Sequence, residues 1–140
     1  MSELETKIRA KMDAHQLAAL ATIAEDGKPW VRYVTPVMDQ DMNIWLATFV
    51  GSRKVAQLRR NPEVHLVVGV TSPEMAESYL QVQGKAQILA DKPTKERVWF
   101  EQLKGIFAGP DDPNYVVVKI TPYRIEYQGM GKVPPAVWTA

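Results

Sequence analysis

The sequence contains no cysteine, and its 140 residues include only two histidines, His15 and His65. Without a thiol the chain can form no disulfide, catalytic thiolate, CxxC redox pair or zinc–thiolate site. Two imidazoles so far apart in the sequence give no obvious metal cluster either. The motifs GxSxG, GxxxxGK(S/T) and GxGxxG are also absent. Their absence argues against the common hydrolases, the nucleotide-triphosphate loop and the dinucleotide-binding fold.

An excess of charge of one sign and a long apolar run are missing as well. Lysine and arginine number 17 against 16 acidic residues, and this balance predicts neither nucleic acid nor an anionic membrane as a partner. The most apolar windows, Leu17–Ala24 and Val64–Val70, are far shorter than the roughly 20 residues of a membrane helix. The acidic start lacks the pattern of a signal peptide, so we expect a cytoplasmic protein. The length favours one domain over residues 1–140.

The apolar pattern predicts a mainly β fold with peripheral helices. Helices are expected from Ser2 to Met12, over Ser52–Asn61, and from Asp91 to Phe107. Six strands are expected, over Leu17–Ala24, Pro29–Met38, Asn43–Thr48, Glu63–Val70, Ser78–Leu89 and Tyr115–Tyr127. The step Asp26–Gly27 predicts a hairpin turn between the first two strands, and Thr121–Pro122 predicts an edge or a bulge in the last. Short turns between strands favour antiparallel pairing in a small barrel or sandwich.

The tetrapeptide Gly51–Lys54, which follows a predicted strand, breaks a local rule. Ser52 is a good helix N-cap, but Arg53 and Lys54 then occupy the first helical turn, where cations oppose the helix dipole. A bound anion reverses that cost. Free backbone N–H groups, a serine hydroxyl, a guanidinium and an ammonium together can hold a phosphate.

The residues alone leave other readings open for these side chains. The basic run continues to Arg59 and Arg60, so a solvated basic surface is the alternative to a phosphate site. Arg32 lies in the middle of a predicted strand, either facing solvent at an edge or as a further cation for the same anion. Trp138, near the chain end, needs a place to dock, whereas the other tryptophans are most simply core residues.

Two stretches together resemble the pyridoxamine 5′-phosphate oxidase superfamily, in its short branch that includes the general stress proteins. One is TFVGSRKVAQL at Thr48–Leu58, followed by NPEV, and the other is GKPWVRYV at Gly27–Val34. The resemblance covers nearly the whole chain. It implies a six-stranded antiparallel split β-barrel that works as a homodimer, with FMN held in grooves between the subunits.

The resemblance also implies roles for particular residues. Arg32, Arg53 and Lys54 would grip the FMN phosphate with Ser52 at the helix start, which are the residues that the dipole argument singles out. The ribityl chain and the ring would lie along Tyr33, Val34, Thr35, Ala47 and Thr48. Independently of the resemblance, we expect Trp138 to cover the ring as a lid, contributed either by the same subunit or by its partner.

Two departures from the family pattern bear on activity. Val37 stands where the oxidase has a lysine that contacts pyridoxal phosphate, and the segment Lys132–Ala140 lacks the oxidase's arginine- and histidine-containing substrate motif. We therefore expect an FMN-dependent oxidoreductase acting on a small molecule other than pyridoxamine phosphate. Because related families use the same fold for other cofactors, the alternatives are an F420- or haem-binding protein and a non-enzymatic flavin carrier or sensor.

Overall fold

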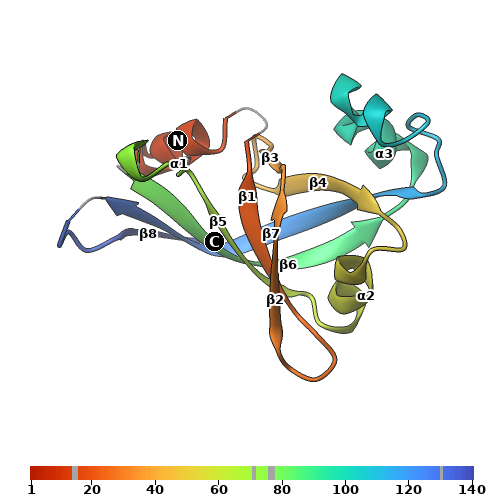
Figure 1. Ribbon diagram of the computed structural model, residues 1–140. Coiled ribbons are helices and arrows are strands. Elements are labelled where there is room, and N and C mark those ends of the chain that lie inside the picture. Colours follow the sequence, from red (N-terminus) through yellow and green to blue (C-terminus); the bar gives the residue numbers. More distant parts are fainter. Residues whose placement is uncertain (14–15, 71, 76–77, 130) are drawn as a thin grey trace.

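The structure, a computed structural model, describes the chain except residues 14–15, 71, 76–77 and 130. It is mainly β, with one curled antiparallel sheet and three α-helices among the described residues (Figure 1). The strands are β1 Ala18–Ile23, β2 Pro29–Val34, β3 Val37–Met38, β4 Ile44–Phe49, β5 Glu63–Val68, β6 Ser78–Leu89, β7 Tyr115–Gly129 and β8 Ala136–Thr139. The helices are α1 Glu3–Lys11, α2 Arg53–Arg60 and α3 Lys92–Val98, with the 3₁₀ turns η1 Pro73–Met75 and η2 Glu101–Gly105. The predicted fold class is confirmed, whereas the described residues form eight strands where six were expected.

The two additional strands come from opposite parts of the chain. The expected strand Pro29–Met38 is broken, because Thr35 and Pro36 separate β2, which pairs with β1, from β3, which pairs with β4. Proline cannot donate to a strand ladder, which suits it to this crossing. The tail contributes β8, which pairs with residues 124–127 of β7.

The sheet order is β2-β1-β5-β6-β7-β4-β3, so β2 and β3 are its two edges. Only Thr35 and Pro36 connect them. Three residue steps, from Val34 to Val37, reach at most about 11 Å, so the sheet must curl until its edges nearly meet. The seam between these edges is the split of the barrel.

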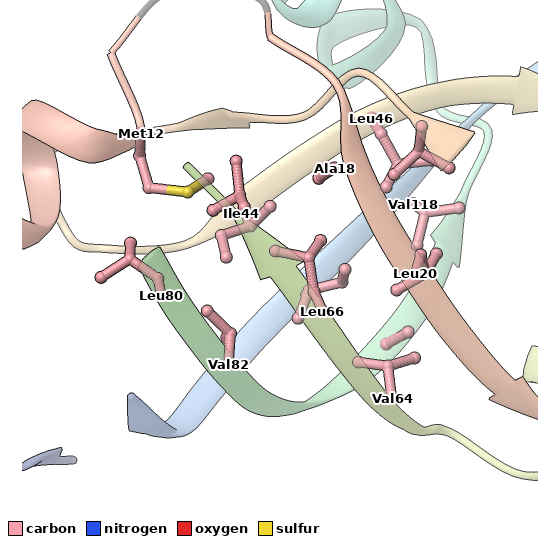
Figure 2. Close-up of a cluster of buried hydrophobic side chains, with 14 of the residues drawn as sticks. Met12, Ala18, Leu20, Ile44, Leu46, Val64, Leu66, Leu80, Val82 and Val118 are labelled. Carbon is pink, nitrogen blue, oxygen red and sulfur yellow. The ribbon is translucent and has the colours of Figure 1, made fainter. Parts of the chain in front are cut away.

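The main core fills the inside of the curled sheet. Alternate residues of β1, β5 and β6 are buried, and Ile8 of α1 belongs to the same cluster. Figure 2 shows this cluster. The labelled side chains that meet there are Met12, Ala18, Leu20, Ile44, Leu46, Val64, Leu66, Leu80, Val82 and Val118. Burying each large aliphatic side chain contributes about 1.5–3 kcal/mol.

The predicted irregularity at Thr121–Pro122 is a bulge. Gln83 pairs with Arg124 and Gly84 with Pro122, so β7 has one extra residue there. A Cβ on Gly84 would lie 2.8 Å from Ile120 Cγ2 and 2.9 Å from the Thr121 carbonyl oxygen. Only glycine therefore allows β6 to approach the bulge this closely.

A second, smaller core lies under the segment that follows β6. The expected helix from Asp91 to Phe107 is interrupted, since Trp99 and Phe100 are extended between α3 and η2. The Trp99 ring packs edge-on against the buried Tyr115 ring at 5.5 Å, and the Phe107 ring packs against it at 5.2 Å. In Figure 1, α2 and α3 lie on opposite sides of the end of β4.

Candidate functional site

A cleft of about 520 Å³ opens along the seam of the sheet. Its volume lies within the range of about 300–1,000 Å³ that is typical of small-molecule sites. The lining residues are Tyr33, Val34 and Thr35 from β2 and its end, Ala47, Thr48 and Phe49 from β4, Lys54 from α2, and Phe100, Gln102, Leu103, Ile106 and Phe107. Six of the ten predicted site residues are among them.

The start of α2 forms one end of this cleft. Ser52 has the extended backbone of an N-cap, but its hydroxyl makes no capping hydrogen bond and lies 3.4 Å from Thr48 Oγ1. The first turn of α2 contains no acidic residue. Its free N–H groups and the helix dipole are therefore available to an anion.

Arg32 reaches this helix from β2 through a buried polar network. Its Nη2 donates to Gln57 Oε1 at 3.0 Å and its Nη1 donates to Thr22 Oγ1 at 2.6 Å, while the Thr22 hydroxyl donates to the same Gln57 oxygen. Thr22 and Gln57 are both buried. A guanidinium held at both ends of its fork has a fixed orientation, so β2 and α2 position it together.

The other two cations lie beside it. Lys54 Nζ donates to Thr48 Oγ1 at 2.5 Å, and the Arg53 guanidinium stacks 4.6 Å above the centre of the Trp30 ring. Burial, and then the charge of Arg53, lowers the pKa of Arg32. Burial, and then the charge of Arg32, lowers the pKa of Lys54 below its usual value near 10.5. The charged forms of Arg32 and Lys54 are thus each destabilised by burial and by a neighbouring cation.

We call Arg32, Arg53 and Lys54 the cation cluster. Within the described part of the chain, none of the ion pairs involves any of the three. Partly buried positive charge without a counter-ion is costly, and an anion is the partner that would relieve it. The arrangement fits a phosphate better than it fits a solvated basic surface.

The opposite end of the cleft is aromatic. We call Phe49, Phe100, Gln102, Leu103, Ile106 and Phe107 the aromatic wall. The Phe49 and Phe107 rings lie 4.7 Å apart, and Phe107 is backed by the buried Tyr115. Flat apolar side chains that are fixed from behind offer a preformed surface for a planar ring.

Two residues that the sequence associated with the site do not line this cleft within the single chain. Trp138 is in β8, pairs with Ile125 and packs half-buried against the main core of its own chain. Val37 lines a smaller neighbouring hollow of about 260 Å³, behind Phe100.

The sequence reading missed the network residues and the aromatic wall. Thr22 continues the inward alternation of Ala18 and Leu20, and Gln57 lies beside Leu58 on the buried face of α2. Each is a polar residue at a position that the pattern directs inward, and this could have identified both as members of a buried hydrogen-bond network. The aromatic wall gave no such signal, because Leu103, Ile106 and Phe107 looked like the apolar side of a continuous helix.

Two classes of site are not seen in the described residues. They contain no group of three histidine, cysteine or carboxylate residues that could hold a metal ion, and His15 lies outside them. None of the described helices is long and apolar enough to cross a membrane.

The amino-acid sequence is similar to a known family and to one of its members. A family model described as Pyridoxamine 5′-phosphate oxidase matches residues 4–129. General stress protein 26 of Bacillus subtilis (strain 168) is 32% identical over 133 residues, which cover 95% of this chain and 94% of that protein.

The fold agrees with solved structures. The crystal structure of general stress protein 26 from Bacillus anthracis matches with a TM-score of 0.84 and 29% identity, over 99% of this chain and all of that one. A protein from Clostridium acetobutylicum, described as related to general stress protein 26, matches with a TM-score of 0.78 and 22% identity, over 97% and 92%. An F420 reductase (TM-score 0.65, 21% identity) and a haem-binding protein from Mycobacterium smegmatis (0.70, 16%) share the fold alone.

Proposed function

This chain belongs to the pyridoxamine 5′-phosphate oxidase family, and we propose that it is a flavoprotein that holds FMN in the cleft. The observation that carries the proposal is the uncapped start of α2 beside a cation cluster without counter-ions. The phosphate would supply the missing negative charge, and the rest of the cofactor would extend from it along the cleft between β2 and β4. Each charge-assisted hydrogen bond to the phosphate is worth about 1.5–3 kcal/mol.

The residues of the chain bind and orient the cofactor. Arg53, Lys54 and the N–H groups after Ser52 hold the phosphate, and Arg32 is aimed at it by Gln57 and Thr22. Tyr33 and Val34 of β2, Thr35 directly after it, and Ala47 and Thr48 of β4 line the cleft and would lie along the rest of the cofactor.

When bound, FMN supplies hydride or electron transfer. The described lining residues include no carboxylate and no imidazole, so we assign no general acid or base among them. The chain's part is to exclude water and to fix the position of the ring. We propose an oxidoreductase whose substrate is not pyridoxamine phosphate, because Val37 offers no charge to its phosphate.

A homodimer is part of the same proposal. Strand β2 is an edge of the sheet, and its apolar residues Val31 and Tyr33 are 67% and 76% exposed. The β1–β2 hairpin projects from the body of the sheet (Figure 1). An apolar edge strand of this kind is usually covered, and a second copy would close the open side of the cleft. Location in the cytoplasm remains a prediction.

The visible absorbance spectrum of the purified protein, before and after addition of FMN, tests the proposal. We expect a flavin band that elutes with a dimer, or saturable quenching of FMN fluorescence. A protein that ignores FMN but retains F420 or haem would overturn it. Reduction of bound flavin followed by turnover with oxidised acceptors would favour an enzyme, whereas a flavin that is reduced but inert would favour a carrier or sensor.

A further inference from the structure

The two ends of the cleft differ sharply in charge. Lys54 is the only charged side chain among the described lining residues, and it lies at the end formed by α2. Glu101 and Lys104, which are adjacent in sequence to residues of the aromatic wall, pair with each other at 2.9 Å and do not line the cleft. An ionised group bound at the aromatic wall would lose water and gain no counter-charge there.

The aromatic wall also leaves apolar surface open in the absence of a ligand. Ile106 is 57% exposed and Phe49 is 49% exposed, although both line the cleft. The buried Leu103 and Phe107 hold this surface in place from behind. A flat apolar ligand would cover this surface without rearranging the wall. Binding is favoured because the side chains of the wall would lose little conformational entropy.

One polar group remains unused at this end. Gln102 is exposed on η2, lines the cleft and makes no hydrogen bond within the described structure. Its amide can donate to a carbonyl oxygen, and the orientation of that amide is open to a ligand. The wall thus combines aromatic faces, no charge and one donor.

We infer that the aromatic wall binds an uncharged, planar aromatic carbonyl compound of the quinone class. The inference rests on the proposed function, since FMN would occupy the part of the cleft between this wall and the cation cluster. The lining selects against charged and phosphorylated molecules and for rings that carry a carbonyl acceptor.

Calorimetric titration of the full-length protein with 2-methyl-1,4-naphthoquinone tests this, without reductant and with and without saturating FMN. The matched charged probe is 1,4-naphthoquinone-2-sulfonate. We expect saturable binding of the uncharged probe and affinity for the sulfonate at least about tenfold weaker. Equal affinities, or no binding of the uncharged probe, would overturn the inference.

Two variants locate the probe. Ile106→Glu places a carboxylate at an exposed position of the wall and should weaken quinone binding at least about tenfold, and Gln102→Leu should weaken it several-fold. Val133→Glu, equally exposed but outside the cleft, should leave it unchanged. If Ile106→Glu converts a dimer to monomers while quinone affinity stays the same, a second copy covers the wall and the inference is wrong.

The FMN titration of the wild-type protein separates the two proposals. A protein that binds FMN but not the quinone refutes the inference and leaves the proposed function standing. A protein that fails to bind FMN refutes the proposed function. In that case, loss of quinone binding in Ile106→Glu still decides whether the wall is the ligand site.

Discussion

The starts of α2 and α3 follow the same backbone pattern but are completed in different ways. Asp91 caps α3 by accepting hydrogen bonds from the Thr94 N–H at 3.1 Å and the Thr94 hydroxyl at 2.8 Å. Ser52 occupies the same position before α2 and caps nothing. The pKa of Asp91 is lowered by these bonds, which shows a carboxylate stabilised at a helix start.

On our proposal, the difference separates a helix start that stabilises the fold from one that binds a ligand. At α3 the chain provides its own anion. At α2 it provides cations and free N–H groups, so the anion must come from outside.

Removal of two cations from α2 should abolish tight FMN binding. Arg53→Ala with Lys54→Ala removes two charge-assisted contacts, so FMN affinity should fall by a factor of about 10²–10⁴. Fluorescence titration measures this, with riboflavin as the ligand that lacks the phosphate. The matched control, Arg59→Ala with Arg60→Ala, removes equal charge from the other end of the helix. Unchanged FMN affinity in the first double variant would refute the phosphate site.

A carboxylate cap on α2, like the one on α3, should raise thermal stability and lower FMN affinity. In Ser52→Asp a carboxylate would accept from the free N–H groups and would lie beside the cation cluster. The FMN-free protein should melt a few degrees higher, and FMN affinity should fall at least about tenfold through repulsion of the phosphate. Ser52→Ala is the control without the charge. A rise in FMN affinity would contradict our account of this helix start.

Removing the cap of α3 should affect stability alone. Asp91→Ala leaves the first N–H groups of α3 without their partner, so thermal unfolding should occur a few degrees lower. FMN affinity should match that of the wild type, because Asp91 is outside the cleft. If FMN binding weakens as much as in Ser52→Asp, the two helix starts do not have separate roles.

The pH dependence of FMN binding should show the smallest effect. Affinity should rise as the phosphate loses its second proton near pH ~6. It should fall several-fold in alkaline solution, below the usual lysine value near 10.5, because burial and Arg32 lower the pKa of Lys54 and the neutral amine no longer attracts the phosphate. Titrations across pH measure both limbs. In Lys54→Arg the side chain keeps its charge at alkaline pH, so the fall in FMN affinity should disappear. If the fall is the same as in the wild type, a group other than Lys54 causes it.

Local patterns predicted much of this molecule. The first hairpin, the alternation of β6 and the span of α2 each depend on neighbouring residues, and all three appear where the sequence places them. The helix predicted to run from Asp91 to Phe107 failed at Trp99 and Phe100. The Trp99 ring packs there on Tyr115, and both residues pack against the smaller core, many of whose members are remote in the sequence. Periodicity carries no information about such a partner.

The sequence by itself determined most of the strands, the helices α1 and α2, and the expectation of an anion at Ser52–Lys54, because dipoles, caps and alternation act over a few residues. Only the tertiary structure decided that Thr35 and Pro36 cross the seam between the two sheet edges, that Arg32 is held by Gln57, and that an aromatic wall faces the cation cluster. The physical reason is that closure of a sheet depends on the burial of the whole core, to which residues far apart in the chain contribute together.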